Sequence, residues 1–257
     1  MLLYRAALDL SPAYRRYVAH LLRAHRRRRI GSRWRALPSK RQALLIPVHL
    51  RRNETFPALA AAFGAGPATA HRYVTEVIEL LAAPAPGLRT AMRIATRKAL
   101  VTLDGTLVPT DRLTGADDRR IHSGKHRRHG VNAQFPTDPH GRLIRASATS
   151  PGSNHDLTAT RVHGIIDALT GRAIACYADK TCSGAGGAIR TPYRRPKGGK
   201  PSKRKKLFNH HHAKIRPLGE QGAATLKRRH ILRHARCSPA RLTAIVQAIL
   251  ALHHHTN

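Results

Sequence analysis

The sequence predicts an α/β fold with a mixed β-sheet, preceded by an all-α domain that contains a helix-turn-helix. Two observations lead to this prediction. Apolar residues recur at helical spacing through much of residues 13–81. After residue 99, short runs rich in β-branched residues alternate with helical segments, an order typical of a sheet covered by helices. The 257 residues, 41% of them hydrophobic, suffice for a real core, in one domain plus a smaller one.

The first helices follow from local patterns. Residues 13–29 predict a helix, since apolar side chains recur at helical spacing at Tyr17, Val18, Leu21 and Leu22. Pro38-Ser39 can start a second helix, which Pro47 is expected to interrupt because proline lacks the backbone donor.

Residues 55–81 have the spacing of a helix-turn-helix. Thr55 can cap a short helix, Gly64 and Gly66 form a tight turn, and Pro67 opens a second helix. In such a motif the N-terminal part of the second helix meets DNA bases, which here predicts contacts from Thr69, His71 and Arg72. An ordinary helical hairpin in a core is the alternative.

Pro84-Ala-Pro86-Gly87 begins a predicted linker over residues 84–99, between a helical domain at 1–83 and a second domain at 100–257. In the second domain, strands are expected at 99–104, 131–135, 142–147 and 173–178, and helices at 154–169, around Glu220 and from Ser238-Pro239. Residues 180–206 are rich in Gly, Pro, Lys and Arg and predict an exposed basic loop, which is either a DNA clamp or a plain insertion.

The charge balance points to nucleic acid. The chain has 47 Lys and Arg against 13 Asp and Glu, a formal net charge of +34, and cations that neutralise phosphates release counterions from DNA. A basic ribosomal or membrane-surface protein is the alternative. The expected phosphate contacts are Lys125, Arg127, Arg128, Lys203, Arg204, Lys205 and Lys206. No apolar run of about 20 residues and no signal peptide is evident, so a cytoplasmic protein without a membrane is expected.

Three carboxylates are candidates for metal ligands. Asp104 and Asp179 each end an apolar β-like run, and Glu220 is the only glutamate after residue 79. Such a set could hold two Mg²⁺ (or Mn²⁺) ions for phosphoryl chemistry, because these ions take hard oxygen ligands. Simpler interpretations are a turn at Asp104, a strand-end cap at Asp179 and an ion pair of Glu220 with Arg216.

Asp156 is the alternative second metal ligand. Its spacing from Ser153 matches a helix capping box, which favours a role as a cap. Zinc is not expected, because no standard ligand spacing is found among His122, His126, His129, His210, His211 and His212, and the three cysteines do not cluster with them.

Five motifs in order resemble the DDE-type transposases of IS5-like bacterial insertion sequences, whose wider superfamily includes the Harbinger-type proteins. They are Leu103-Asp-Gly-Thr106, Ser123-Gly-Lys-His-Arg-Arg-His-Gly130, Pro151-Gly-Ser-Asn-His-Asp156, Ala178-Asp-Lys180 and His212-Ala-Lys-Ile-Arg-Pro-Leu-Gly-Glu220. The resemblance covers roughly residues 50–257. The chain departs from the family at Lys180-Thr-Cys-Ser-Gly184, where an aromatic residue is usual, and at Pro217, one turn before Glu220.

The resemblance implies an RNase H-like catalytic fold, two divalent metals, and Asp104, Asp179 and Glu220 as catalytic metal ligands. It implies cutting and joining of double-stranded DNA at element ends, by a homo-oligomer that is nucleoid-associated in bacteria. Two other functions stay open. One is a non-catalytic or domesticated DNA-binding protein that uses the helix-turn-helix, and the other is a nuclease that acts on RNA–DNA hybrids.

Overall fold

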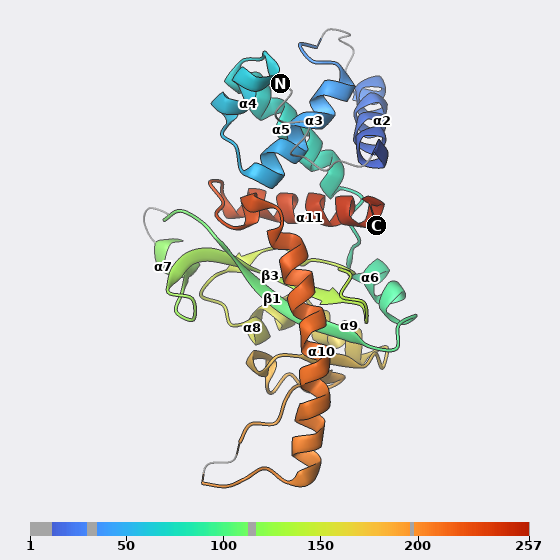
Figure 1. Cartoon of the computed structure of the whole chain (residues 1–257), viewed down its shortest axis with the longest axis vertical. Helices are drawn as coiled ribbons and strands as arrows, with labels where there is room; N and C mark the ends of the chain where they lie inside the picture. The colour runs from blue at the N-terminus through green and yellow to red at the C-terminus, as the bar shows by residue number, and fades with distance from the viewer. Residues whose placement is uncertain (1–11, 30–34, 113–116, 196–197, 257) are drawn as a thin grey trace. The chain divides into compact units, whose positions relative to one another are not determined.

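The computed structural model describes residues 12–29, 35–112, 117–195 and 198–256 (Figure 1). The chain forms two compact units, residues 1–85 with 227–257, and residues 86–226. Within the described ranges, every helix is too short or too polar to cross a bilayer.

The first unit is helical. Its elements are α2 (Pro12–Arg29), α3 (Ser39–Arg52), α4 (Phe56–Phe63), α5 (Pro67–Ala82), η2 (His230–Leu232) and α11 (Pro239–Thr256). Helix α3 continues through Pro47, contrary to the predicted interruption. Both Pro47 and its neighbour Ile46 are buried, so tertiary packing outweighs the missing backbone hydrogen bond.

The predicted helix-turn-helix is confirmed at α4 and α5. The Thr55 hydroxyl accepts a hydrogen bond from the backbone N–H of Ala58 (3.4 Å) and caps α4. Gly64 ends α4 with a left-handed φ of 67°, a conformation that glycine adopts without strain. Gly66 caps α5, and Pro67 lies in its first turn. The cap, the turn glycines and the first-turn proline predicted from the sequence therefore all have the predicted roles in the structure.

Helix α11 packs against α5 in the first unit. Its apolar face is the predicted one, and it is buried at Leu242, Ile245, Val246, Ile249 and Leu252. The described residues from Lys227 to Thr256 therefore belong to the unit of the N-terminal helices, whereas the sequence analysis grouped them with the second domain. The apolar face of α11 can be predicted from the spacing of its own residues, but the helices against which it packs cannot.

The second unit contains a six-stranded mixed sheet. Its strands are β1 (Val101–Pro109), β2 (His122–Ser123), β3 (Arg128–Thr137), β4 (Ser150–Pro151), β5 (Cys176–Ala178) and β6 (Ile189–Arg190). The order is β2-β3-β1-β5-β6, with β4 paired to β3. Strand β1 is antiparallel to β3 and parallel to β5, so the predicted mixed α/β sheet is confirmed.

The two faces of β1 have different partners. Val101 and Leu103 are buried in a core with α6 (Leu88–Ala95) and α9 (Ile165–Thr170). Side chains alternate along a strand, so Asp104 lies on the opposite face. That face is crossed by α10 (Lys203–Lys227), as Figure 1 shows. The strand thus separates an apolar core from a face that carries a carboxylate.

Several predicted elements differ from the structure. Residues 142–147 form no regular strand; an isolated bridge joins Leu143 to Thr137, and the backbone N–H groups of Ile144 and Ser147 donate to carbonyls of β3 (2.9 and 2.7 Å). The helix expected at 154–169 is two helices, α8 (Asp156–Val162) and α9, because Gly164 between them has a left-handed φ of 63°. Helix α6 lies inside the predicted linker 84–99 and contributes Ala91, Met92 and Ala95 to the core.

The basic segment 180–206 is only partly a loop. It contains η1 (Lys180–Cys182) and β6, and residues 203–206 form the first turn of α10. Asn209 of α10 fastens the preceding segment, since its side chain accepts from the backbone N–H of Tyr193 (2.9 Å) and donates to the carbonyl of Tyr193 (3.0 Å). Helix α10 therefore begins well before Pro217, which lies in its interior. Helix α7 (Asp117–Ile121) precedes β2.

Candidate active site and DNA-binding surfaces

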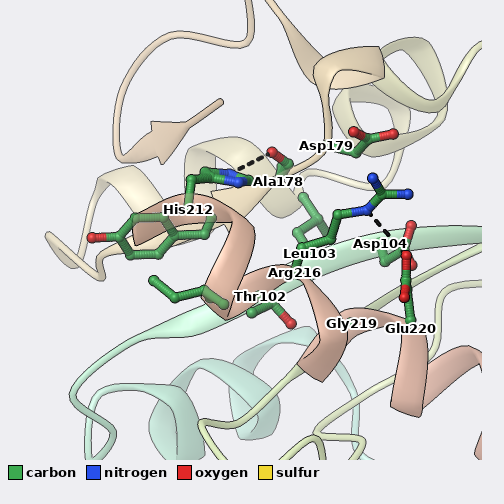
Figure 2. Close-up of a pocket in the computed structure, with 11 residues that line it drawn as sticks. Thr102, Leu103, Asp104, Ala178, Asp179, His212, Arg216, Gly219 and Glu220 are labelled. Carbon is green, nitrogen blue, oxygen red and sulfur yellow. Dashed lines mark hydrogen bonds and ion pairs between the residues drawn. The ribbon is translucent and has the colours of Figure 1, made fainter. Parts of the chain in front are cut away.

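Three elements of the second unit meet at a small pocket (Figure 2). Asp104 comes from β1, Asp179 follows β5, and Glu220 lies on α10. The pocket has a volume of about 60 Å³, which is room for a few water molecules but not for a nucleotide. The three carboxylates selected from the sequence thus line one pocket.

Asp104 is largely buried at the centre of this site. Burial raises the pKa of its carboxyl, and the charges of Asp156 and Asp179 raise that pKa further. The backbone N–H of Gly105 donates to the carboxylate (2.8 Å) and opposes the shift. A buried anion among other anions is unfavourable alone, so the site favours a cation next to Asp104.

Strand pairing brings Asp179 close to Asp104. Leu103 of β1 is in register with Ala178 of the parallel strand β5, so Asp104 is the next residue of β1 and Asp179 is the residue that directly follows β5. The Asp179 carboxylate also accepts a hydrogen bond from the backbone N–H of Lys180 (2.7 Å) and caps η1. Asp179 therefore caps the helical turn that follows β5, as the simpler interpretation predicted, and it also lines the pocket.

Glu220 is the most accessible of the three carboxylates. Its side chain is 57% exposed and pairs with Arg216 one turn earlier (3.0 Å between Oε1 and Nε). In the view of Figure 2, the Arg216 guanidinium lies between the carboxylates of Asp179 and Glu220. A positive charge of the chain itself thus lies beside the acidic groups.

Two residues of α10 hold this helix against the sheet. A Cβ on Gly219 would lie 3.3 Å from Cβ of Asp104, so glycine permits a close approach of the helix to β1. His212 is buried, with Nε2 3.1 Å from the carbonyl oxygen of Ala178 at the end of β5. These contacts set the position of Glu220, which follows Gly219 directly. Sequence reasoning missed both; an isolated Gly inside a helical pattern was the available signal for close packing.

Asp156 lies at the face of β1 opposite Asp104. A Cβ on Gly105, which alternates with Asp104, would lie 2.7 Å from Oδ1 of Asp156. That oxygen accepts hydrogen bonds from Asn132 (2.9 Å) and Gln134 (3.2 Å), and Oδ2 is 3.2 Å from Nζ of Lys125. Burial would raise the pKa of Asp156, but these donors outweigh it and lower the pKa. Asp156 is therefore held as an anion.

The predicted capping box is wrong. The N-cap of α8 is His155, without a side-chain hydrogen bond, and Asp156 is the first helical residue. The Asp156 carboxylate turns to Asn132 and Gln134 of β3 instead of the backbone N–H of Ser153. Local spacing favoured a cap because the partners on β3 are distant in sequence.

The side chains of the pocket can be compared with the ligands that metal ions prefer. Among the described residues, no three His, Cys, Asp or Glu side chains are close enough together to hold a metal ion. The pocket lining nevertheless includes three carboxylates, the ligand type that Mg²⁺ prefers, at Asp104, Asp179 and Glu220. Their chemistry fits a hard divalent cation, with Glu220 free to turn because its side chain is exposed.

The predicted DNA contacts lie in three places. On α5, His71 and Arg72 are exposed and Thr69 is half-buried. An exposed turn between β2 and β3 carries Lys125 and Arg127, and the exposed Arg128 follows as the first residue of β3. The exposed first turn of α10 holds Lys203, Arg204, Lys205 and Lys206. None of these is buried in a core, so all are available to a polyanion.

Comparison with known proteins gives two family matches. Residues 103–254, more than half of the chain, match the DDE superfamily endonuclease family. Residues 35–86 match the helix-turn-helix of DDE superfamily endonuclease. Searches of the curated proteins and of the solved structures find no match.

Proposed function

Because the chain belongs to the DDE superfamily endonuclease family and contains that family's helix-turn-helix, we propose that it is a transposase of the IS5-like type, with an RNase H-like catalytic unit. It would cut and join DNA strands at the ends of its element. One observation carries the proposal. Asp104, Asp179 and Glu220 come from three separate elements and line a single pocket in a chain of net charge +34.

In this proposal the three carboxylates hold two divalent ions, Mg²⁺ or Mn²⁺. When bound, these ions stabilise the attacking and leaving oxygens of a phosphodiester. Asp104 supplies a buried anion that favours cations, and Asp179 adds a second anion on the neighbouring strand. Arg216 neutralises Glu220 in the absence of a cation and must release it for binding.

The DNA-binding role divides between two kinds of contact. Thr69, His71 and Arg72 on α5 would read bases, as the N-terminal part of a recognition helix does. The basic residues of the β2–β3 turn and of the first turn of α10 would contact phosphates, which carry no sequence information. Lys125 is held by Asp156, so its ammonium group is oriented before DNA arrives. A homo-oligomer on DNA completes the proposal.

A non-catalytic DNA-binding protein is the second candidate. The ion pair between Glu220 and Arg216 favours it, since it neutralises one of the three required carboxylates. Such a protein would bind DNA through α5 and cleave nothing.

Cleavage of duplex DNA taken from both flanks of the coding region, with and without Mg²⁺, tests the proposal. Asp104→Asn, Asp179→Asn and Glu220→Gln should each abolish cleavage and retain DNA binding. Asp167→Asn removes a charge from an exposed position of α9 and serves as the matched control. Asp156→Asn should mainly lower stability, because its carboxylate bonds to β3.

A triad variant that keeps the parental cleavage rate would remove that residue from the proposed ligands. DNA binding without cleavage by the parent protein would favour the non-catalytic candidate. Cleavage restricted to RNA–DNA hybrids would make the chain a different nuclease and refute the transposase.

A further inference from the structure

A groove between α2 and α3 is lined by five cationic and three apolar residues. It has a volume of about 390 Å³, and its residues are Pro12, Arg15, Arg16, Ala19, Arg23, Lys40, Arg41 and Leu44. No described carboxylate lines it. Four of the cations are exposed, namely Arg15, Arg16, Arg23 and Lys40, and none of these four forms an ion pair within the described part of the chain.

The two walls of the groove are formed by residues on one face of α2 and residues on one face of α3. Arg16, Ala19 and Arg23 follow the i, i+3, i+7 spacing of one helix face. On α3, Lys40 and Leu44 are one turn apart. Arg41 is already engaged, since its guanidinium donates to the carbonyl of Phe63 (3.3 Å). The floor is apolar at Ala19 and Leu44, and the exposed rim carries the positive charge.

A second groove in the same unit has a different character. It lies along α5, and its lining includes two carboxylates, Glu76 and Glu79, besides His71 and Arg72. Glu76 is held by Arg35 (3.4 Å) and by Gln42 (2.8 Å). A groove lined by both anions and cations can discriminate between partners, because its carboxylates repel a partner anion that is not placed opposite a cation. The α2–α3 groove, whose charged residues are all cationic, attracts any polyanion of suitable shape.

We propose that the groove between α2 and α3 grips the sugar-phosphate backbone of DNA independently of sequence, as a surface additional to the helix-turn-helix. From Arg16 to Arg23, seven steps along α2, the helix rises roughly 10 Å, which is about three phosphate steps along one DNA strand. The family's helix-turn-helix match begins at residue 35, so α2 is outside it. The inference rests on the proposed DNA-binding function.

The test measures binding of the full chain to a random 25-base-pair duplex over a series of salt concentrations. Arg16→Gln combined with Arg23→Gln removes two groove cations. Arg27→Gln combined with Arg28→Gln is the matched control, since these arginines are exposed on the same helix but do not line the groove. All four positions are at least partly exposed, and circular dichroism verifies the fold of both double variants.

The groove variant should flatten the slope of log K against log[salt] by about 1.8, from about 0.9 for each phosphate contact. The control should keep the parental slope. Equal flattening in both variants, or none in the groove variant, overturns the inference and leaves the proposed function standing. If the groove variant binds DNA like the parent but no longer binds anionic phospholipid vesicles, the inference is also overturned. Absence of any duplex binding by the parent would instead refute the proposed function.

Discussion

Replacement of Gly105 by Ala tests the packing between β1 and Asp156. The added Cβ would lie 2.5 Å from Nε2 of Gln134 and 2.7 Å from Oδ1 of Asp156. Gln134 is fully buried, and the Asp156 carboxylate is bonded to Asn132, so neither group can simply turn away. The φ of Gly105 lies outside the left-handed region, so alanine brings no backbone strain and the cost is steric.

The magnitude follows from two contributions. Overpacking of a buried site costs about 1–3 kcal/mol. Separation of Gln134 from Asp156 loses a hydrogen bond to a charged acceptor, about 1.5–3 kcal/mol. Because partial relaxation of the strand relieves part of both, we expect Gly105→Ala to lower the free energy of unfolding by about 2–4 kcal/mol.

Urea denaturation followed by circular dichroism measures this loss. Gly124→Ala is the matched control in the same unit, because its Cβ would meet nothing within 4 Å and its φ is not left-handed. That variant should stay within about 1 kcal/mol of the parent. If Gly105→Ala unfolds at the same urea concentration as Gly124→Ala, the close contact at β1 is not present in solution.

Two further predictions concern pH. Asp104→Asn should raise the thermal unfolding midpoint at pH 7, because burial and the charges of Asp156 and Asp179 raise the pKa of Asp104, and stability is lost as pH rises through that pKa. The gain in midpoint should vanish below about pH 4, where Asp104 is protonated in both the folded and the unfolded state. An unfolding midpoint at pH 7 equal to that of the parent would contradict this prediction. Burial lowers the pKa of His49 to about 4, so the helical unit should lose about 3 kcal/mol as pH falls from about 6.5 to 4. His49→Gln should remove that loss in a pH series of melts, and a parent that is insensitive over this range would contradict the burial of His49.

Features that depend on neighbouring residues were predictable from the sequence. The helix-turn-helix rests on Thr55, Gly64 and Pro67, whose preferences act within one turn of the chain. Strand β1 was expected as a short run to Asp104 and extends to Pro109, because pairing with β3 stabilises residues beyond the apolar run. Local pattern therefore predicts that an element exists more reliably than where it ends.

Features that depend on distant partners were missed. Residues 142–147 have a strand-like composition, yet their backbone bonds to β3 through one bridge and two separate hydrogen bonds, from Ile144 and Ser147, and these do not make a regular strand. Asp156 was read as a cap since its partners, Asn132 and Gln134, are more than 20 residues away in sequence. The pocket residues were selected from motifs, but their common lining of one pocket requires the pairing of β1 with β5.

The geometry explains why a carboxylate from a helix can join two from a sheet. Asp104 projects from the face of β1 that α10 covers, and a Cβ at position 219 would meet Cβ of Asp104 at 3.3 Å, closer than an ordinary contact. A Cβ at Gly222, one turn later, would lie 2.5 Å from Cγ2 of Thr137, so a second glycine is needed where the helix crosses β3. The two glycines let α10 lie close to the sheet where it crosses β1, the strand that carries Asp104. Glu220, between them in sequence, thereby lines the same pocket as Asp104.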